Sequence, residues 1–232
     1  MDGHCGRNAR TGPPGGRGRP RHVIAGAVRR HAASPRSQPM RILPIPLVLL
    51  ILWSGAAAAE PRRYVIDPEH ATVAFLVRHI GYASVLASFL KLEGAFTYDH
   101  DARTLDDLVV SIDARSVFSN HAARDEHVRG PDFLDSGRNP VIRFVGTRAE
   151  PTGDATGRVY GELTVRGTAR PVEIAVTRNK MGPYPWGENY VVGISARTTL
   201  KRSDFGMTYG LEGDLVGDEV EVIIELEAIR RP

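Results

Sequence analysis

Cysteine is almost missing from this sequence. The 232 residues include a single cysteine, Cys5, and the region after Ala59 has none. A region without cysteine forms no disulfide bond, has no thiol nucleophile and has no cysteine that could carry a lipid anchor. The part of the chain after Ala59 must therefore be held together by a buried apolar core, and it is long enough to form one.

The common motifs of catalysis and nucleotide binding are also missing. The sequence contains no Gly-x-Ser-x-Gly turn, no serine with a base at a recognised spacing and no glycine-rich phosphate loop. Pairs of acids such as Asp106-Asp107 fall in expected turns, where solvated carboxylates are ordinary. The sequence therefore predicts a protein that is not an enzyme.

A basic surface is missing once the N-terminal region is set apart. The whole chain has a net charge of +3, but residues 1–59 hold nine arginines against one acid, Asp2. Residues 60–232 hold the other 21 Lys and Arg against 26 Asp and Glu, which is a net charge of −5. Nucleic-acid binding needs positive charge on the folded domain. We therefore expect no nucleic-acid partner.

The first 59 residues divide into two segments. Residues 1–39 are rich in Arg, Gly and Pro and show no apolar periodicity, so we expect them to be disordered or to be an extension upstream of the true start at Met40. Residues 40–59 combine Arg41, a short apolar run and small residues before Glu60, which is typical of a signal peptide cut after Ala59. A retained membrane anchor is the alternative, although the run is short for a bilayer. We expect a soluble protein exported to the periplasm.

Residues 60–232 lack long helical periodicity and repeatedly show strand-like alternation of apolar and polar residues. Turn signals such as 151–154 and 182–185 separate the strands. Sequential antiparallel strands with short turns close most simply into a barrel without exposed edges. We therefore predict an all-β fold, an extended eight-stranded antiparallel barrel, with a β-sandwich as the alternative. The eight runs cover 72–79, 91–99, 108–114, 142–145, 161–165, 172–177, 190–198 and 220–227.

One short helix is expected between residues 120 and 134. Asn120 or Ser119 is a suitable N-cap, and Asp125 would lie near the positive end of the helix. The later apolar pair Phe133-Leu134 could close the helix against the mouth of the barrel. This segment is therefore predicted to be a lid or plug.

Aromatic residues in the alternating strands are the best candidates for the barrel interior. A barrel of eight strands either fills with side chains or holds one small ligand. Small residues on the same faces, such as Gly94 and Gly161, favour remaining space. A filled barrel that binds a membrane redox protein stays open as an alternative. The aromatic candidates for the interior are Phe89, Phe96, Tyr98, Phe133 and Phe144.

Histidines provide the alternative to a simple container. His79 shares the phase of Phe75 and is expected to be a satisfied interior residue or a contact for a ligand head group. His121 and His127 are six residues apart, which places their rings on different faces of a helix. We expect no metal site, and a small-molecule enzyme or metal protein using His79, His121 or His127 is the alternative.

Several short motifs occur in a recognisable order from Tyr64 to about Glu227. The motifs are YVID (64–67) with Glu69-His70, VRH (77–79) with Gly81, GAF (94–96) with Tyr98-Asp99, RDEHVRGPDFLD (124–135) with Asn139-Pro140, Ile142 and Phe144, GELT (161–164) with Gly167-Thr168 and Arg170-Pro171-Val172, RSDFG (202–206) and GDEV (217–220). With these motifs in this order, the chain resembles the YceI-like family of periplasmic, lipocalin-like polyisoprenoid-binding proteins. It departs from the usual family pattern at Ala71, Ala87 and Leu134.

The resemblance implies a lipocalin-like barrel over residues 60–232 that binds a long isoprenoid lipid, such as a quinone or a polyprenyl phosphate, and needs no other cofactor. A transient contact with the membrane or with a membrane redox protein, and a homodimer, stay open. The candidate ligand-binding residues are Phe75, Arg78, His79, Phe89, Phe96, Tyr98, Ile112, Arg124, Asp125, Phe133, Phe144 and Phe205.

Overall fold

The computed structural model describes residues 60–232. The predicted upstream extension (1–39) and the predicted signal peptide (40–59) lie outside the described residues. Within the described part, the alternating runs form long antiparallel strands, as the sequence predicts. No helix in this part is long and apolar enough to cross a lipid bilayer.

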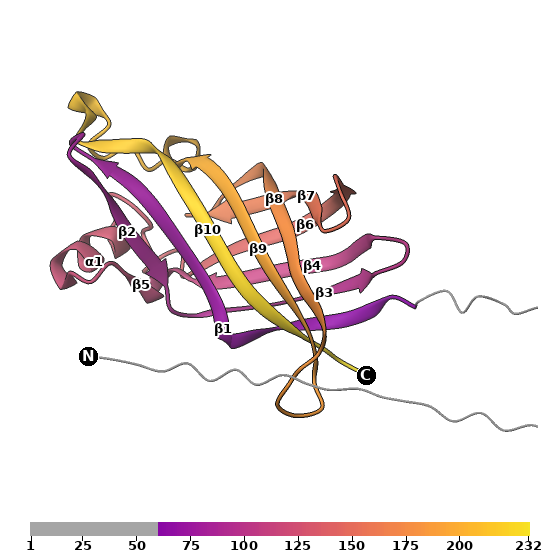
Figure 1. Cartoon of the computed structure of the whole chain (residues 1–232). Coiled ribbons are helices and arrows are strands. Elements are labelled where there is room, and N and C mark those ends of the chain that lie inside the picture. The colour runs from indigo at the N-terminus through magenta and orange to yellow at the C-terminus, as the bar shows by residue number, and fades with distance from the viewer. Residues whose placement is uncertain (1–59) are drawn as a thin grey trace, which may run out of the picture. The chain divides into compact units, whose positions relative to one another are not determined.

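Strand pairing closes the sheet into a barrel (Figure 1). Eight strands, β1, β3, β4 and β6 to β10, follow one another as antiparallel neighbours, and β10 pairs with β1 to complete the ring. The predicted eight-stranded antiparallel barrel is therefore confirmed, and the sandwich alternative is wrong. The strands are β1 (Arg62–His79), β2 (Ala83–Phe89), β3 (Leu92–Asp99), β4 (Thr104–Asp113), β5 (Val117–Phe118), β6 (Val141–Pro151), β7 (Thr156–Val165), β8 (Thr168–Pro183), β9 (Tyr190–Lys201) and β10 (Val216–Arg230).

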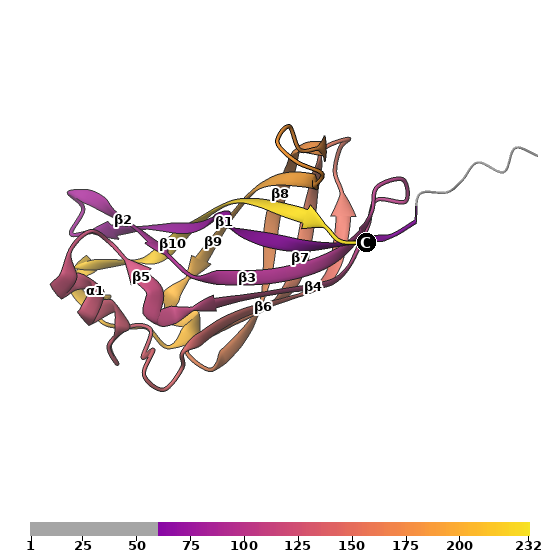
Figure 2. The same cartoon turned by 90° about the horizontal axis from the view of Figure 1, so that it is seen from below.

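Two of the ten strands, β2 and β5, extend this barrel at one end. The long strand β1 pairs with β3 through its first residues and with β2 through Val73 to His79. Only Leu90 and Lys91 separate β2 from β3, so the two act as one interrupted strand beside β1. Strand β5 follows β4 after a short 3-10 helix (η1, Ala114–Ser116) and pairs with β2. Figure 2 shows β2, β5 and the helix gathered at this end.

The predicted lid is an α-helix, α1 (Ala122–Arg129), at the same end of the barrel. Its N-cap is His121, whose Nδ1 accepts a hydrogen bond from the Arg124 backbone N–H at 3.2 Å. The prediction of Ser119 or Asn120 as the cap is wrong. Asn120 adopts a left-handed conformation (φ 61°) that turns the chain, so the helix can begin only after it.

The barrel is packed with side chains toward the turn between β8 and β9. Tyr64 and Phe96 stack there with ring centroids 5.3 Å apart, and they pack with Val192 and Ala228. A second, larger core cluster lies toward α1 and includes Phe89, Leu134 and Phe205. This second cluster surrounds the cavity described below, so one end of the barrel is filled and the other is hollow.

Gly161 on β7 allows the close packing of the wall beside this cavity. A Cβ atom at Gly161 would lie 2.4 Å from Cζ of Phe144 and 2.4 Å from the Val145 carbonyl oxygen. We expect Gly161→Ala to lower the free energy of unfolding by about 1–3 kcal/mol, because β6 and Phe144 must shift. Gly182→Ala on β8 is the control, since its Cβ would meet nothing within 4 Å. Equal denaturation midpoints for the two variants would contradict this account.

Candidate functional site

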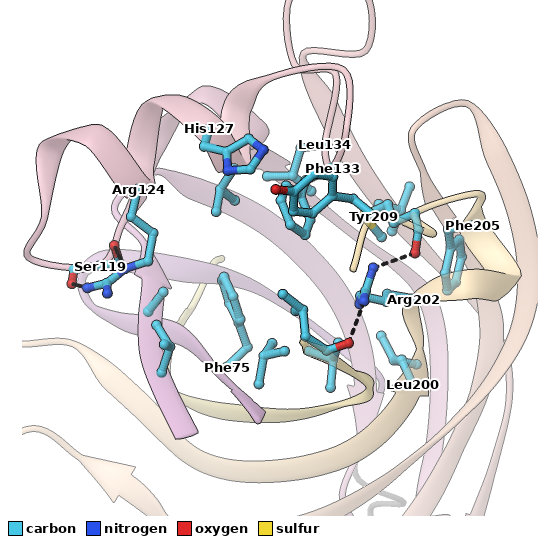
Figure 3. A pocket seen from close by; sticks show the side chains of 18 of the residues that line it. Phe75, Ser119, Arg124, His127, Phe133, Leu134, Leu200, Arg202, Phe205 and Tyr209 are labelled. Atoms are coloured by element: carbon cyan, nitrogen blue, oxygen red, sulfur yellow. Dashed lines mark hydrogen bonds between the residues drawn. The ribbon is translucent and has the colours of Figure 1, made fainter. Parts of the chain in front are cut away.

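The hollow end of the barrel contains a cavity of about 530 Å³ (Figure 3). Its wall is mostly apolar and comes from β1, β2, β6, β7, β9, β10, α1 and the segments that follow α1 and β9. The volume is within the range of small-molecule sites, roughly 300–1,000 Å³. The apolar lining residues are Phe75, Val77, Val85, Ala87, Phe89, Ala123, Val128, Phe133, Leu134, Ile142, Leu163, Val165, Leu200, Phe205, Met207, Val216, Val220 and Val222.

Strand alternation explains why so much of this lining is apolar. Along β2, Val85, Ala87 and Phe89 line the cavity, while Leu86 between them is 59% exposed on the other face. Ala87 pairs with Phe75 across the β1–β2 ladder, so a methyl group lies next to an aromatic ring. Small and large side chains placed side by side leave the space that the cavity occupies.

The structure brings seven of the twelve predicted site residues together around this cavity: Phe75, Arg78, His79, Phe89, Arg124, Phe133 and Phe205. Phe89 and Phe205 are buried in its wall. Arg78 and His79, at the end of β1, are exposed at its edge. The cavity therefore combines an apolar interior with polar groups at its mouth.

The other five predicted residues lie elsewhere. Phe96 and Tyr98 line a separate pocket of about 120 Å³ at the filled end of the barrel. Phe144 is buried in the wall over Gly161, and Ile112 packs against the larger core cluster. Asp125 is buried on α1 and does not border the cavity. A ligand role for these five remains a prediction.

Asp125 and Arg124 fix the start of α1 to the segment after β5 through Ser119. Oδ1 of Asp125 accepts hydrogen bonds from the Ser119 backbone N–H at 2.7 Å and from its hydroxyl at 2.5 Å. Nε of Arg124 donates to the Ser119 hydroxyl oxygen at 2.8 Å, and Nη2 donates to the Ser119 carbonyl oxygen at 2.7 Å. Ser119 and Arg124 also line the cavity, so this network holds the lid at the cavity edge (Figure 3).

The Ser119 hydroxyl is the main reason why the pKa of Asp125 is below its ordinary value. Burial acts in the opposite direction, and the Ser119 backbone N–H adds to the lowering. A lowered native pKa stabilises the fold above the unfolded value of about 3.9, and this stability is lost as the pH falls through the native pKa. Asp125→Asn should therefore cost about 1.5–3 kcal/mol of unfolding free energy at pH 7.

We expect this difference between Asp125→Asn and wild type to shrink as the pH falls from about 5 toward 2, because the wild-type carboxylate then becomes protonated. Urea denaturation at a series of pH values measures it. The control is Glu126→Gln on the same helix, where Glu126 is exposed and pairs with Arg129 at 3.4 Å. A constant difference across this pH range would contradict the assigned role of Asp125.

Three rings from two separate segments meet across one side of the cavity. His127 on α1 contacts Phe133 and Tyr209 edge to face, with ring centroids 5.0 and 4.8 Å apart. Phe133 and Tyr209 are also in contact at 5.4 Å. Tyr209 comes from the segment after β9, so the rings join the lid to that segment (Figure 3). The sequence analysis did not identify Tyr209 as a site residue. The one local feature that could have marked it is its position between Gly206 and Gly210, in an expected loop.

Arg202 is a buried cation in the apolar wall, and sequence reasoning missed its role. It begins the 3-10 helix η2 (Arg202–Phe205), it is 3% exposed, and it lines the cavity. Its guanidinium donates hydrogen bonds to the carbonyl oxygens of Met207, Val216 and Gly217, each at 2.7 Å. Burial lowers its pKa, and the charge of Asp218 opposes that effect. Arg202 therefore closes the segment from Met207 to Gly217 over the end of the barrel.

The buried polar side chains in and near the cavity are paired. Within residues 60–232, every buried side-chain nitrogen and oxygen has a hydrogen-bond partner. His127 is paired with Asp132, with Nε2 3.0 Å from Oδ2. The described residues with metal-ligand geometry are Asp67, His70 and Glu227, whose ligand atoms lie within 4.8 Å of one another. None of these three borders the cavity.

Comparisons with known proteins agree with this fold. The model of the YceI-like domain matches residues 64–228. A UPF0312 protein of Pseudomonas paraeruginosa is 36% identical over 181 residues, which cover 78% of this chain and 93% of the relative. The crystal structure of Burkholderia cenocepacia BcnA superimposes with a TM-score of 0.63 at 23% identity, covering 70% of this chain and 98% of BcnA.

A third similar protein is a polyisoprenoid binding domain from Saccharophagus degradans, described as implicated in plant cell wall breakdown. Its structure superimposes with a TM-score of 0.55 at 13% identity and covers 74% of this chain and all of that domain. At this identity the similarity shows a shared fold.

Proposed function

Because this chain belongs to the YceI-like domain family, we propose that it binds one long isoprenoid lipid in the barrel cavity and carries or sequesters that lipid in the periplasm. The observation that carries the proposal is the apolar cavity of about 530 Å³ at the hollow end of the barrel. The description of the Saccharophagus degradans domain as polyisoprenoid-binding supports the same class of ligand. Binding of this kind needs no catalytic residue.

The lining favours a flexible, branched hydrocarbon over a polar metabolite. Burial of apolar groups stabilises a complex by about 0.8 kcal/mol per CH₂ before the cost of ordering the chain. Drug-sized ligands retain only about 0.3 kcal/mol per atom. A prenyl tail has enough carbon atoms to bind tightly even at that value. It has no polar groups for which the lining would have to provide hydrogen-bond partners.

The polar groups at the mouth are the proposed contacts for the head group of the lipid. Arg78, His79 and Arg124 border the cavity where β1 ends and α1 begins. These groups could donate hydrogen bonds to a quinone carbonyl or to a phosphate oxygen. The tail would then extend inward past Phe75 and Phe89. This orientation, tail inside and head at the mouth, is part of the proposal.

Titration with matched ligands tests the proposal and distinguishes the two head groups. Geranylgeranyl phosphate, geranylgeraniol and a ubiquinone with four isoprene units share a tail of similar length. The proposal expects saturable binding of one molecule per chain by calorimetry for at least one of them. Tighter binding of the phosphate than of the alcohol would assign a phosphate head group. No saturable binding of any of the three would contradict the proposal.

Export is the other part of the proposal, and N-terminal sequencing tests it. We expect protein recovered from the periplasm of a Gram-negative host to begin at Glu60, because the signal peptide is predicted to be cut after Ala59. A protein that stays in the cytoplasm with its first 59 residues attached would contradict a periplasmic role. The titration would then decide separately whether the protein binds the lipid.

A further inference from the structure

Apolar side chains are exposed around the mouth of the cavity. Tyr82 in the β1–β2 turn is 91% exposed and Ile80 in the same turn is 46% exposed. Tyr209 and Leu215, in the segment between β9 and β10, are each 47% exposed. The two segments are joined, because the Ile80 backbone N–H donates to the Leu215 carbonyl oxygen at 3.0 Å. We call Ile80, Tyr82, Tyr209 and Leu215 the mouth patch.

The mouth patch is continuous with the cavity lining. His79 precedes Ile80 and Val216 follows Leu215, and both of these neighbours line the cavity, as does Tyr209. Apolar surface therefore runs from the interior of the barrel to solvent through Tyr209 and Val216, beside the polar groups Arg78 and His79. An apolar patch of this kind marks a surface that is covered by another apolar phase or partner.

Charge is sparse in the segments that carry the patch, where the exposed acids Glu212 and Asp214 precede Leu215. Residues 80–90 contain no acid and no base, and neither do residues 205–211. At the border of the patch, Arg78 is neutralised by Asp214, with Nη2 of Arg78 2.6 Å from Oδ1 and 2.9 Å from Oδ2 of Asp214. These two uncharged stretches can enter a low-dielectric medium at small desolvation cost.

The backbone at Ile80 adds an independent argument. Ile80 has φ 49° and Gly81 has φ 70°, and the Tyr82 N–H donates to the His79 carbonyl oxygen at 3.1 Å. A turn with two positive φ values favours Asn-Gly, and a β-branched residue at its first position is strained. The chain nevertheless places an isoleucine there, half exposed to water. Strain that stabilises neither the turn nor the core points to a use for this side chain.

We propose that the mouth patch docks on the surface of a lipid bilayer, with Ile80 and Tyr82 inserted among the lipids and the cavity mouth facing them. This inference rests on the proposed function, since a prenyl lipid resides in a membrane before a carrier takes it up. Tyrosine suits the bilayer interface because its ring is apolar and its hydroxyl is polar. Docking would let the tail slide from the bilayer into the cavity without crossing water.

Electrostatics gives the docking a recognisable signature. Residues 60–232 carry a net charge of −5, so anionic lipids repel the domain while apolar insertion attracts it. We therefore expect binding to zwitterionic phosphatidylcholine vesicles at low salt to be tighter than binding to vesicles containing phosphatidylglycerol. Added salt should reduce this difference, because it screens the repulsion.

A single tryptophan placed in the patch reports insertion directly. The chain has two tryptophans, and one of them, Trp186, is 78% exposed in the turn between β8 and β9, at the filled end of the barrel (Figure 1). In a Trp53→Phe background, Trp186 is the control reporter. Tyr82→Trp combined with Trp186→Phe is the test reporter. With empty vesicles that contain brominated lipids, we expect quenching and a blue shift for the test reporter only.

Uptake of the lipid is tested with Ile80→Ser/Tyr82→Ser, since neither side chain lines the cavity. Burial of one such side chain is worth about a tenfold change in affinity. Vesicle binding and the rate of prenyl-lipid uptake from vesicles should therefore fall at least tenfold, while the affinity for geranylgeranyl phosphate in solution should stay unchanged. Trp186→Ser, at the other end of the barrel, should change neither.

Three results would overturn the docking. The first is a rate of lipid uptake by the double variant equal to that of the wild type. The second is an equal fluorescence response of the two tryptophan reporters. The third is a dimer that buries the mouth patch and does not bind vesicles. Each of them leaves the proposed function intact if one lipid still binds in solution. The empty-vesicle experiment contains no isoprenoid, so its result also stands if the titration shows that the proposed ligand is wrong.

Discussion

Ala87→Trp should reduce the affinity for a long isoprenoid at least 100-fold while the barrel stays folded. Ala87 lies on β2, lines the cavity and pairs with Phe75. An indole at this position would occupy space that the prenyl tail needs. Loss of about four buried CH₂ groups at ~0.8 kcal/mol each corresponds to a factor of about 100 or more. Because the cavity has room for the new ring, the usual overpacking cost of about 1–3 kcal/mol should be reduced.

Leu86→Trp is the matched control for this variant. Leu86 is the preceding residue on β2, and its side chain is 59% exposed on the outer face of the sheet. The same ring would therefore be added to the same strand without entering the cavity. Calorimetric titration of both variants, together with thermal unfolding, measures the effect. Equal affinity of the two variants for the lipid would show that the ligand does not occupy this cavity.

Arg202→Met should lower the free energy of unfolding by about 3–5 kcal/mol, because each buried acceptor that is left without its donor costs about 1–3 kcal/mol. The substitution keeps an apolar stem of similar length but leaves the carbonyl oxygens of Met207, Val216 and Gly217 without their donor. Hydrogen exchange should also become faster from residue 206 to residue 217, because Arg202 is the group that closes this segment. Urea denaturation measures the loss.

Arg197→Met is the control for Arg202, because both arginines are on or next to β9 and their environments differ. The Arg197 side chain is 47% exposed and pairs with Glu225 at 2.7 Å on the surface. Such exposed pairs contribute less than about 1 kcal/mol. A loss for Arg202→Met as small as that for Arg197→Met would show that the three carbonyl contacts do not hold the segment.

The barrel could be predicted from the sequence because strand alternation is a local property. Along β10, Val220 and Val222 face the cavity and Glu221 between them is exposed, and this pattern is visible in the residues alone. Strand β2 was missed because its small and apolar residues, from Ala83 to Phe89, include no charged residue that would mark an outer face. Strand β5 has only two residues and is defined by its partner. The resemblance to the YceI-like family is confirmed by the match over residues 64–228.

The cavity could be predicted only in part, for two physical reasons. Alternation shows which face of a strand a residue occupies, but not its height along the barrel. Phe75 and Phe96 were therefore treated alike, although one lines the cavity and the other packs against Tyr64 at the filled end. The role of Arg202 could not be predicted, because its three carbonyl partners come from a segment whose path depends on tertiary structure.

The central claim is that this barrel holds one isoprenoid lipid in its hollow end. Native mass spectrometry of protein purified from the periplasm, followed by solvent extraction and identification of the released molecule, tests it most directly. We expect one prenyl lipid per chain in the wild type and in Leu86→Trp, and none in Ala87→Trp. A wild-type protein that keeps the mass of the bare chain, even after incubation with quinones and polyprenyl phosphates, would contradict the account.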